Sequence, residues 1–192
     1  MEQYLQKSGR KLVVVALESS GAPDYGRLKE YAPFSFTTEE TGGIIGNGDI
    51  TMDWVVHVLK RTVDTQYRTK ADRRHTFLAG SSMGGLMTLY GLLAYPEVFS
   101  RGAALSPSLW IDAEKVKAMI RHARVKRNTV LYMDYGALEF ADHPHSRSLF
   151  AEVSALLIEK RVLLNSRIVP RGTHCEASWE KQIPFFMKTL FE

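Results

Sequence analysis

The pentapeptide Gly-Ser-Ser-Met-Gly at residues 80–84 has the spacing of a nucleophilic serine motif. It matches G-x-S-x-G in one frame only, with Ser82 at the centre, because Ala79 excludes a frame centred on Ser81. In this motif a sharp strand-to-helix turn holds the serine hydroxyl exposed above a sheet, and the glycines let strand and helix pack closely. We therefore predict that Ser82 is a nucleophile and that the backbone N–H of Met83, at the start of the helix, helps to stabilise an oxyanion.

A serine hydroxyl is a poor nucleophile unless a base takes its proton. His174 is the best candidate for that base, because it follows the last predicted strand, at residues 163–169, and precedes the final predicted helix. The other histidines lie inside or at the ends of predicted helices or ahead of the nucleophile strand; they are His57, His75, His122, His143 and His145. For these we predict surface or capping roles.

An acid that orients the base is expected on the loop after the predicted strand at residues 129–133. Three carboxylates in this region compete for that role: Asp134, Glu139 and Asp142. Asp134 still belongs to the end of the strand, whereas Glu139 follows the turn made by Gly136 and is able to reach back toward the base. We favour Glu139 and keep Asp142, or a Ser-His dyad without an essential acid, as alternatives.

These residue types predict cleavage of a small-molecule carboxylic ester through an acyl-enzyme on Ser82, a reaction that needs no metal or organic cofactor. Trp110 follows the predicted strand at residues 102–105 and is a candidate wall of the substrate pocket, since α/β sheets bind ligands at the carboxyl ends of their strands. Core packing is the alternative for this residue. A metal site is not predicted, because the side chains that come into question lack a recognised metal spacing; they are Asp142, His143, His145 and Cys175.

Short aliphatic runs predict the strands that must position these side chains; they lie at residues 12–17, 76–79, 102–105, 129–133 and 163–169. Helical spacing of apolar residues predicts helices between them, at residues 49–66, 86–93, 112–120, 144–156 and 179–190, with Asp112 as the N-cap of the third. This alternation predicts a three-layer α/β fold with a mostly parallel sheet and right-handed crossovers.

The length of 192 residues, 45% of them hydrophobic, predicts a single domain over residues 1–192. The 25 basic and 21 acidic residues are spread along the chain without a basic stripe, so nucleic acid is not an expected partner. The longest aliphatic run is far shorter than the roughly 20 residues that span a bilayer, and no membrane association is expected. A single cysteine, Cys175, and a polar N-terminus without an apolar signal core favour a cytoplasmic protein.

Several further segments, in the same order along the chain, match those of a known family. They are Arg-Leu-Lys-Glu-Tyr-Ala-Pro at 27–33, Tyr-Pro-Glu-Val-Phe at 95–99, Leu-Ser-Pro-Ser-Leu-Trp at 105–110 and Gly-Thr-His-Cys-Glu-Ala-Ser-Trp at 172–179. Together with the serine motif they resemble the Putative esterase family of α/β hydrolases, which groups esterase D and the enterochelin esterases. The resemblance implies an esterase in which Ser82 and His174 are catalytic and Glu139 takes the place of the acid, although Ala137 replaces the usual threonine near it.

The N-terminal part of the chain departs from this pattern. Members of the family usually have further strands ahead of the equivalent of residues 12–17, and one of these lies beside the nucleophile strand and precedes a second oxyanion donor. We expect either that residues 12–17 pair with the nucleophile strand and bring residues 18–21 near the site, or that a homodimer covers the open strand edge. A truncated form is the third explanation.

Two other functions remain open at this point. A missing oxyanion donor costs roughly 10²–10³ in rate, so a catalytically weak or silent hydrolase-like binding module is an alternative. An acyltransferase would use the same serine chemistry with an alcohol as acceptor.

Overall fold

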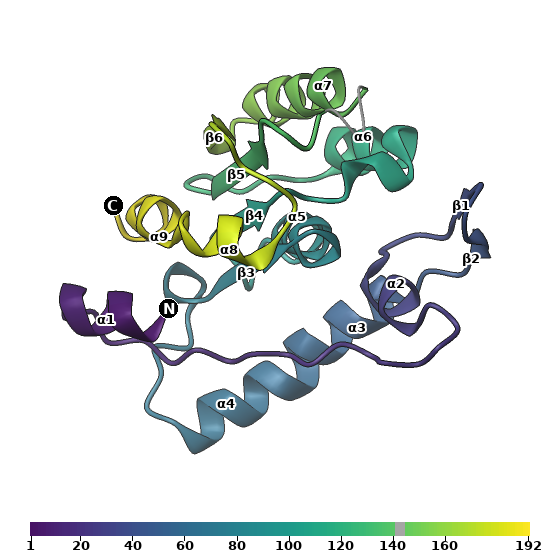
Figure 1. Ribbon diagram of the computed structural model, residues 1–192. Helices are drawn as coiled ribbons and strands as arrows, with labels where there is room; N and C mark the ends of the chain where they lie inside the picture. The colour runs from purple at the N-terminus through teal and green to yellow at the C-terminus, as the bar shows by residue number, and fades with distance from the viewer. Residues whose placement is uncertain (141–144) are drawn as a thin grey trace.

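A parallel sheet forms the centre of the molecule in the computed structural model, which describes residues 1–140 and 145–192. Within these residues the sheet has four strands in the order β3-β4-β5-β6. They are β3 (Phe77–Ser81), β4 (Arg101–Leu105), β5 (Val130–Gly136) and β6 (Leu163–Val169). A small antiparallel hairpin of β1 (Phe36–Thr38) and β2 (Gly42–Ile44) stands apart from this sheet (Figure 1).

Helices connect successive strands and cover the sheet on both faces (Figure 1). The connecting helices are α5 (Met83–Ala94), α6 (Ala113–His122) and α7 (Ser146–Glu159), and the chain ends in α8 (Glu176–Glu180) and α9 (Ile183–Phe191). Ahead of the sheet lie α1 (Glu2–Ser8), α2 (Gly26–Tyr31), α3 (Gly48–Trp54) and α4 (Lys60–Gln66). The predicted three-layer α/β fold is confirmed. No helix in the described ranges is both long and apolar enough to cross a membrane.

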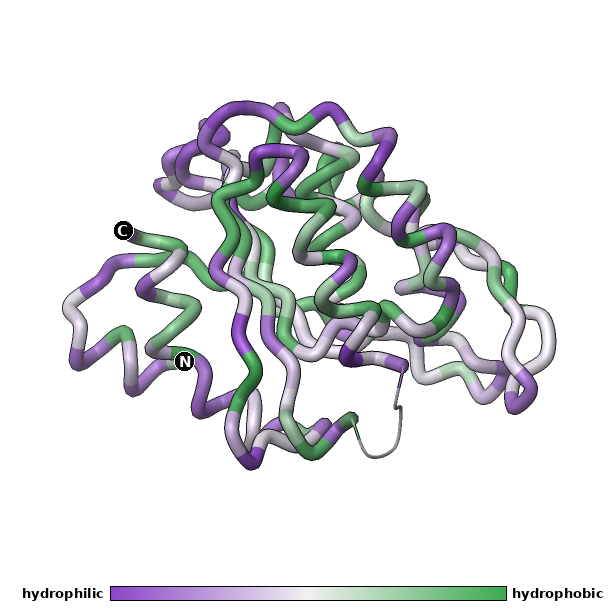
Figure 2. Tube along the Cα trace, turned by 90° about the horizontal axis from the view of Figure 1, so that it is seen from above, coloured by the Kyte–Doolittle hydropathy of each residue, from purple (hydrophilic) through white to green (hydrophobic). Residues whose placement is uncertain are grey.

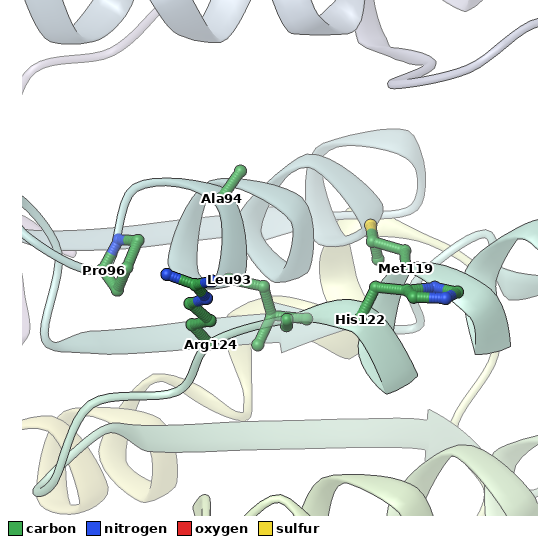
Figure 3. Close-up of a pocket in the computed structure, with 7 residues that line it drawn as sticks. Leu93, Ala94, Pro96, Met119, His122 and Arg124 are labelled. Carbon is green, nitrogen blue, oxygen red and sulfur yellow. The ribbon is translucent and has the colours of Figure 1, made fainter.

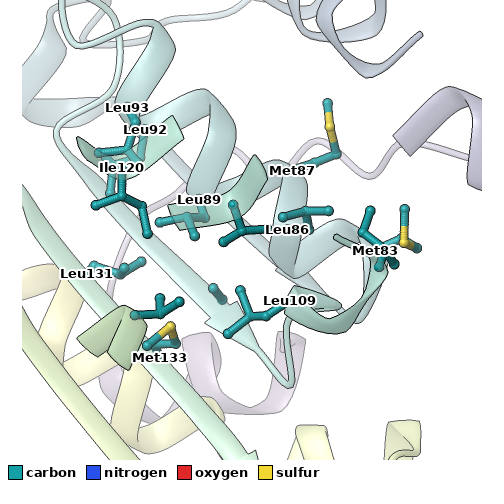
Figure 4. Close-up of a cluster of buried hydrophobic side chains, with 14 of the residues drawn as sticks. Met83, Leu86, Met87, Leu89, Leu92, Leu93, Leu109, Ile120, Leu131 and Met133 are labelled. Carbon is teal, nitrogen blue, oxygen red and sulfur yellow. The ribbon is translucent and has the colours of Figure 1, made fainter. Parts of the chain in front are cut away.

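Two hydrophobic clusters lie on the two faces of the sheet. The larger one contains side chains of α3, α5, α6 and α7 together with residues of β4 and β5, and Figure 4 shows part of it. The smaller one joins Leu105 and Tyr132 of the sheet to Phe186 and Leu190 of α9. Hydrophobic colour in Figure 2 follows the central strands and the inner sides of the helices, while hydrophilic residues lie mostly on outer segments. Burial of this kind fixes the layers because each element hides its apolar face against another.

The sequence pattern located the ends of the sheet strands within three residues, apart from the first expected strand. The predicted runs at residues 76–79, 102–105, 129–133 and 163–169 correspond to β3, β4, β5 and β6. Asp112 is the N-cap of α6, as predicted, because its side chain accepts a hydrogen bond of 3.0 Å from the N–H of Lys115.

The expected strand at residues 12–17 is wrong. This segment has no strand assignment and does not pair with β3, whose one strand neighbour in the described part of the chain is β4. Its side chains are exposed, with Val14 58% exposed, and it runs extended past α3 and α4 in Figure 1. The β-branched composition was read correctly as extended backbone, but a strand also needs a partner edge, and composition does not supply one.

The predicted helix at residues 49–66 is helical but not uniform. Between α3 and α4 the segment Val55–Leu59 is a π-helix, which takes in more residues per turn than an α-helix. Met52, Val55 and Val56 are the buried apolar side chains of α3 and the π-helix, whereas Ile50 and Val58 are 66% and 50% exposed. A periodicity of 3.6 cannot describe a helix that changes its pitch.

Candidate active site

Ser82 lies in a strained turn between the sheet and a helix. β3 ends at Ser81 and α5 begins at Met83, and Ser82 between them has φ 57° and ψ −122°. Positive φ is unusual for a residue with a side chain and persists only when the surroundings hold it. Here the N–H of Ser82 donates to the carbonyl of Leu105 at 2.9 Å, and its carbonyl accepts from the N–H of Ser108 at 3.1 Å. The end of β4 and the loop after it therefore hold the turn through hydrogen bonds to both the N–H and the carbonyl of Ser82.

The first glycine of the motif permits this turn. A Cβ atom built on Gly80 would lie 2.4 Å from the carbonyl oxygen of Gly84, which is backbone and unable to move aside. A Cβ on Gly84 itself would meet nothing within 4 Å. Close packing of β3 against α5 thus depends on Gly80, and the sequence-based expectation that both glycines serve this packing holds for only one of them.

The three side chains predicted from the sequence lie in one hydrogen-bonded row. The hydroxyl oxygen of Ser82 is 3.0 Å from Nε2 of His174, and Nδ1 of His174 is 2.8 Å from Oε2 of Glu139. The imidazole is 43% exposed, whereas the side chain of Glu139 is 4% exposed. Solvent-borne molecules therefore have access to the serine and histidine, while the carboxylate is shielded behind them.

Two loops meet to bring Glu139 and His174 together. Gly136 and Gly172 touch so closely that a Cβ on Gly136 would be 2.4 Å from the carbonyl carbon of Gly172. The same loops are joined by a backbone hydrogen bond of 3.0 Å, which the N–H of Leu138 donates to the carbonyl of Gly172. Because β5 and β6 are adjacent and parallel, their carboxyl ends deliver both loops to the same edge of the sheet.

Hydrogen bonds keep Glu139 ionised in spite of its burial. Burial alone raises the pKa of this carboxyl, but hydrogen bonds from His174, Ser106 and the N–H of Gly136 outweigh it, so the net pKa lies below the usual 4.5. Oε1 accepts from the Ser106 hydroxyl at 2.7 Å and from the Gly136 N–H at 2.8 Å. A carboxylate held in this state is suited to orient the imidazole and to stabilise its cation.

Ser106, Trp179 and Asp134 complete this polar cluster, and sequence reasoning missed their part in it. The Ser106 hydroxyl accepts from Nε1 of Trp179 at 3.0 Å, and the Trp179 ring stands edge-on to His174 with centroids 5.0 Å apart. Asp134 Oδ1 accepts from the N–H of Ser106 at 3.2 Å. A signal existed for Ser106, since it directly follows β4, the strand next to the one that carries Asp134, and the carboxyl ends of parallel strands meet.

Asp134, which the sequence analysis assigned to the strand end and set aside as the acid, is hydrogen-bonded to Ser106 and Tyr132 and not to His174. Its second oxygen, Oδ2, accepts a hydrogen bond from the Tyr132 hydroxyl at 2.7 Å, and Asp134 is 1% exposed. Burial is the main reason that its pKa is raised to about 6, with the charge of Glu139 adding to the rise. Asp142, the other alternative acid, lies outside the described residues.

The remaining predicted site residues are placed as follows. Met83 is the first residue of α5, so its N–H has no acceptor within the helix. Trp110 is 42% exposed on a short 3₁₀ turn, Leu109–Ile111, whose other two residues are buried, and the alternative of core packing is therefore wrong for Trp110.

Of the metal-site candidates, His143 lies outside the described residues, as does Asp142. Among the described ones, no group of three or more His, Cys, Asp or Glu is arranged to hold a metal ion.

A shallow depression elsewhere on the surface is not part of this site. It is lined by Leu93, Ala94, Pro96, Met119, His122, Ala123 and Arg124, most of which Figure 3 labels. These residues lie near the carboxyl end of α5, and Ser82 precedes its amino end, about 17 Å away at 1.5 Å per residue.

Comparison with known proteins links this geometry to a family. The sequence profile of the family described as "Putative esterase" matches residues 3–187. The iron(III) salmochelin esterase of Escherichia coli is 35% identical over 78 residues, which are 40% of this chain and 19% of that protein. The chain thus spans about a fifth of this curated relative.

Solved structures share the fold. An IroE-like serine hydrolase from Shewanella oneidensis superposes with a TM-score of 0.69 at 18% identity, covering 85% of this chain and 55% of that one. The BES protein from Bacillus cereus superposes with a TM-score of 0.69 at 16% identity, covering 85% of this chain and 62% of that one. The enterobactin esterase FES from Shigella flexneri superposes with a TM-score of 0.58 at 24% identity, covering 75% of this chain and 38% of that one. At these identities the likeness concerns the fold, and the chain spans little more than half of the first two structures.

Proposed function

The chain belongs to the Putative esterase family, and from this premise we propose that it is a serine hydrolase that cleaves carboxylic esters. The observation that carries the proposal is the row of hydrogen bonds from Ser82 through His174 to Glu139, with distances of 3.0 and 2.8 Å. Such a row is what activates a serine hydroxyl, because each group fixes the orientation of the next.

In the proposed reaction His174 takes the proton of Ser82 as the serine oxygen attacks the ester carbonyl. The carbonyl electron pair moves onto oxygen to give a tetrahedral intermediate, whose collapse expels the alcohol with the proton from His174. Water then attacks the acyl-enzyme by the same route and releases the acid. Glu139 keeps Nδ1 protonated and offsets the positive charge that develops on the imidazole.

The oxyanion of the intermediate needs donors close to Ser82. The N–H of Met83 is our candidate, since it is the first N–H of α5, a helix of 12 residues whose dipole also favours negative charge at this end. Trp110 is our candidate for a wall of the substrate site, because it is an exposed aromatic ring two residues after Ser108, which touches Ser82.

We propose small-molecule carboxylic esters as the substrate class. The names of the relatives include salmochelin, enterobactin and ferulic acid esterases. These names guide the choice of substrates to test on this chain. Nitrophenyl esters are the first choice, because their leaving group reports turnover directly.

The test compares ester hydrolysis by the wild type with that by Ser82→Ala, His174→Ala and Glu139→Gln. We expect Ser82→Ala and His174→Ala to lower kcat by at least about 10³-fold, and Glu139→Gln by less, since serine and base remain in contact. Ser81→Ala is the matched control, since its serine is the immediate neighbour in the motif. Hydrolysis that survives Ser82→Ala would overturn the proposal, and product formed only in the presence of an alcohol would favour an acyltransferase.

We further propose that two copies of the chain associate through the open edge of the sheet. β3 has a strand neighbour on one side only within the described residues, and the apolar segment at residues 12–17 is exposed. An unpaired strand edge and exposed apolar side chains are both surfaces that proteins usually cover.

A further inference from the structure

Ser108 presents a second hydroxyl to the nucleophile. Its oxygen is 3.3 Å from the hydroxyl oxygen of Ser82. Ser108 is 1% exposed, and Ser82 is the hydrogen-bonding partner that the structure gives its hydroxyl. A buried hydroxyl rotates to donate to the acceptor within reach, because an unused donor is costly in the interior. Its proton therefore points toward the oxygen that would attack the substrate.

The contact is built by rigid backbone on both sides. Ser108 N–H donates to the carbonyl of Ser82 at 3.1 Å, so the two residues are tied together before their side chains meet. The residue before it, Pro107, accepts a hydrogen bond of 2.7 Å from the buried Tyr135 hydroxyl. A Cβ on Gly85 would lie 3.0 Å from Pro107, which shows how closely the loop packs on the start of α5. The Ser108 hydroxyl is thus preorganised rather than mobile.

The positions of the protons decide what the Ser108 hydroxyl can do. Ser82 donates its own proton to Nε2 of His174, which leaves lone pairs of its oxygen free to accept. As that proton moves to His174, the oxygen becomes negatively charged, and a hydrogen bond to an ion is about twice as strong as one between neutral groups. The Ser108 contact therefore strengthens on the way to the transition state, which is the condition for it to raise kcat.

Resting on the proposed function, we propose that Ser108 is a catalytic hydrogen-bond donor of this site. Its hydroxyl donates to the oxygen of Ser82 as the proton passes to His174, and then to the oxyanion formed when the Ser82 oxygen bonds to the ester carbon. The Ser108 proton stays on Ser108 throughout, so the balance of the reaction is unchanged. Together with the Met83 N–H this gives the oxyanion two donors, one from the backbone and one from a side chain.

Three substitutions separate this role from simple filling of space. Ser108→Ala removes the hydroxyl, and Ser108→Thr retains it at a position with φ −72°, which a β-branched residue accepts. Ser100→Ala is the matched control, because Ser100 is also buried, at 3% exposed, and its hydroxyl has no hydrogen-bond partner among the described residues. Thermal unfolding of each variant establishes that it is folded.

The measurements are kcat and KM for a nitrophenyl ester and the affinity for a boronic acid, which forms a tetrahedral adduct with the serine oxygen. For Ser108→Ala we expect kcat to fall about 10- to 100-fold with little change in KM, and the boronate to bind more weakly by a similar factor. Ser108→Thr recovers most of both, and Ser100→Ala changes neither. A folded Ser108→Ala protein with wild-type kcat and boronate affinity would overturn the role of Ser108.

The rate at which a fluorophosphonate labels Ser82 separates this inference from the proposed function. A wild-type protein that takes up no label at Ser82 contradicts the proposed function, and the role of Ser108 fails with it. A wild type that is labelled, with Ser108→Ala labelled equally fast, contradicts the role of Ser108 alone. Labelling that slows in Ser108→Ala and recovers in Ser108→Thr supports both.

Discussion

At the scale of single residues, the candidate site extends inward beyond the three side chains that the sequence motifs identify. Ser82 and His174 were predictable because a strained turn and a loop after the last strand are encoded locally. The partners of Glu139 were not predictable in this way. Ser106 and Trp179 are separated by 73 positions yet share a hydrogen bond of 3.0 Å. Their meeting depends on the order of strands in the sheet, which local spacing does not fix.

Loss of the Ser106 hydroxyl should loosen Glu139. Ser106 has φ 41°, so Ser106→Gly removes the hydroxyl without adding backbone strain. We expect kcat/KM for ester hydrolysis to fall about tenfold, because Glu139 loses one of its orienting donors, while KM changes little. Trp179→Phe is the comparison variant, since it keeps an aromatic ring beside His174 while it removes the indole N–H that donates to Ser106, together with part of the ring system; its loss should be about threefold or less. Equal losses in both variants would contradict this role.

Burial of Asp134 should make stability depend on pH. Its pKa is about 6 in the folded protein and 3.8 in the reference state, so the folded state holds the proton over a range in which the unfolded chain has lost it. The resulting stabilisation is present at low pH and is lost as pH rises through about 6, by about 3 kcal/mol. Asp134→Asn removes this titration.

Denaturant unfolding of the wild type and Asp134→Asn across this pH range tests the prediction. The wild type should lose stability relative to the variant as pH rises through this range. If the free energies of unfolding of the two proteins stay parallel from acid to neutral pH, the pKa of Asp134 is the same in the folded and unfolded states, which contradicts the prediction.

At the scale of elements, the alternation of strands and helices was readable from the sequence because each parallel strand is a short aliphatic run between helical patterns. The exceptions are instructive. Residues 12–17 have the composition of a strand without a partner edge, and the π-helix at Val55–Leu59 changes the phase of an otherwise regular helix. In both cases tertiary contacts, rather than local preference, determine the outcome.

The junction of β3 and α5 should tolerate substitution at only one of its two glycines. Gly80→Ala would place a Cβ 2.4 Å from the backbone of Gly84, so we expect a loss of about 1–3 kcal/mol in stability and a clear loss of esterase activity. Gly84→Ala has open space within the same motif and should be neutral or stabilising by up to about 1 kcal/mol, since alanine favours helices. Thermal unfolding and ester hydrolysis of both variants provide the check. Similar behaviour of the two would contradict the packing described here.

At the scale of the whole molecule, the site occupies one edge of the sheet, and the open side of β3 with the segment at residues 12–17 lies on the surface. Leu12, Val13, Val14, Val15 and Leu17 are all between 37% and 58% exposed. Sequence reasoning predicted the layers, and it left open whether residues 12–17 would pair with the nucleophile strand or its edge would stay open. It did not predict that this segment would stay unpaired, because its composition says nothing of whether it reaches the open edge of β3.

Self-association should follow from this surface. We expect light scattering to detect a fraction of dimer that rises with protein concentration. Val14→Lys should lower this fraction, because a charge at the centre of the segment opposes burial in an interface. Val14 is 58% exposed, so the substitution should leave thermal unfolding of the protomer almost unchanged. A wild type that is monomeric at every concentration would contradict the proposed dimer.

The most direct test of the proposed serine hydrolase is to react the folded protein with a fluorophosphonate and to locate the adduct by peptide mass spectrometry. In this reaction the serine oxygen displaces fluoride from phosphorus, which requires an activated hydroxyl and leaves a stable mark. We predict one adduct per chain, on Ser82 and not on the adjacent Ser81, and its loss in His174→Ala. An unlabelled wild type, or label on another residue with Ser82 unmodified, would contradict it.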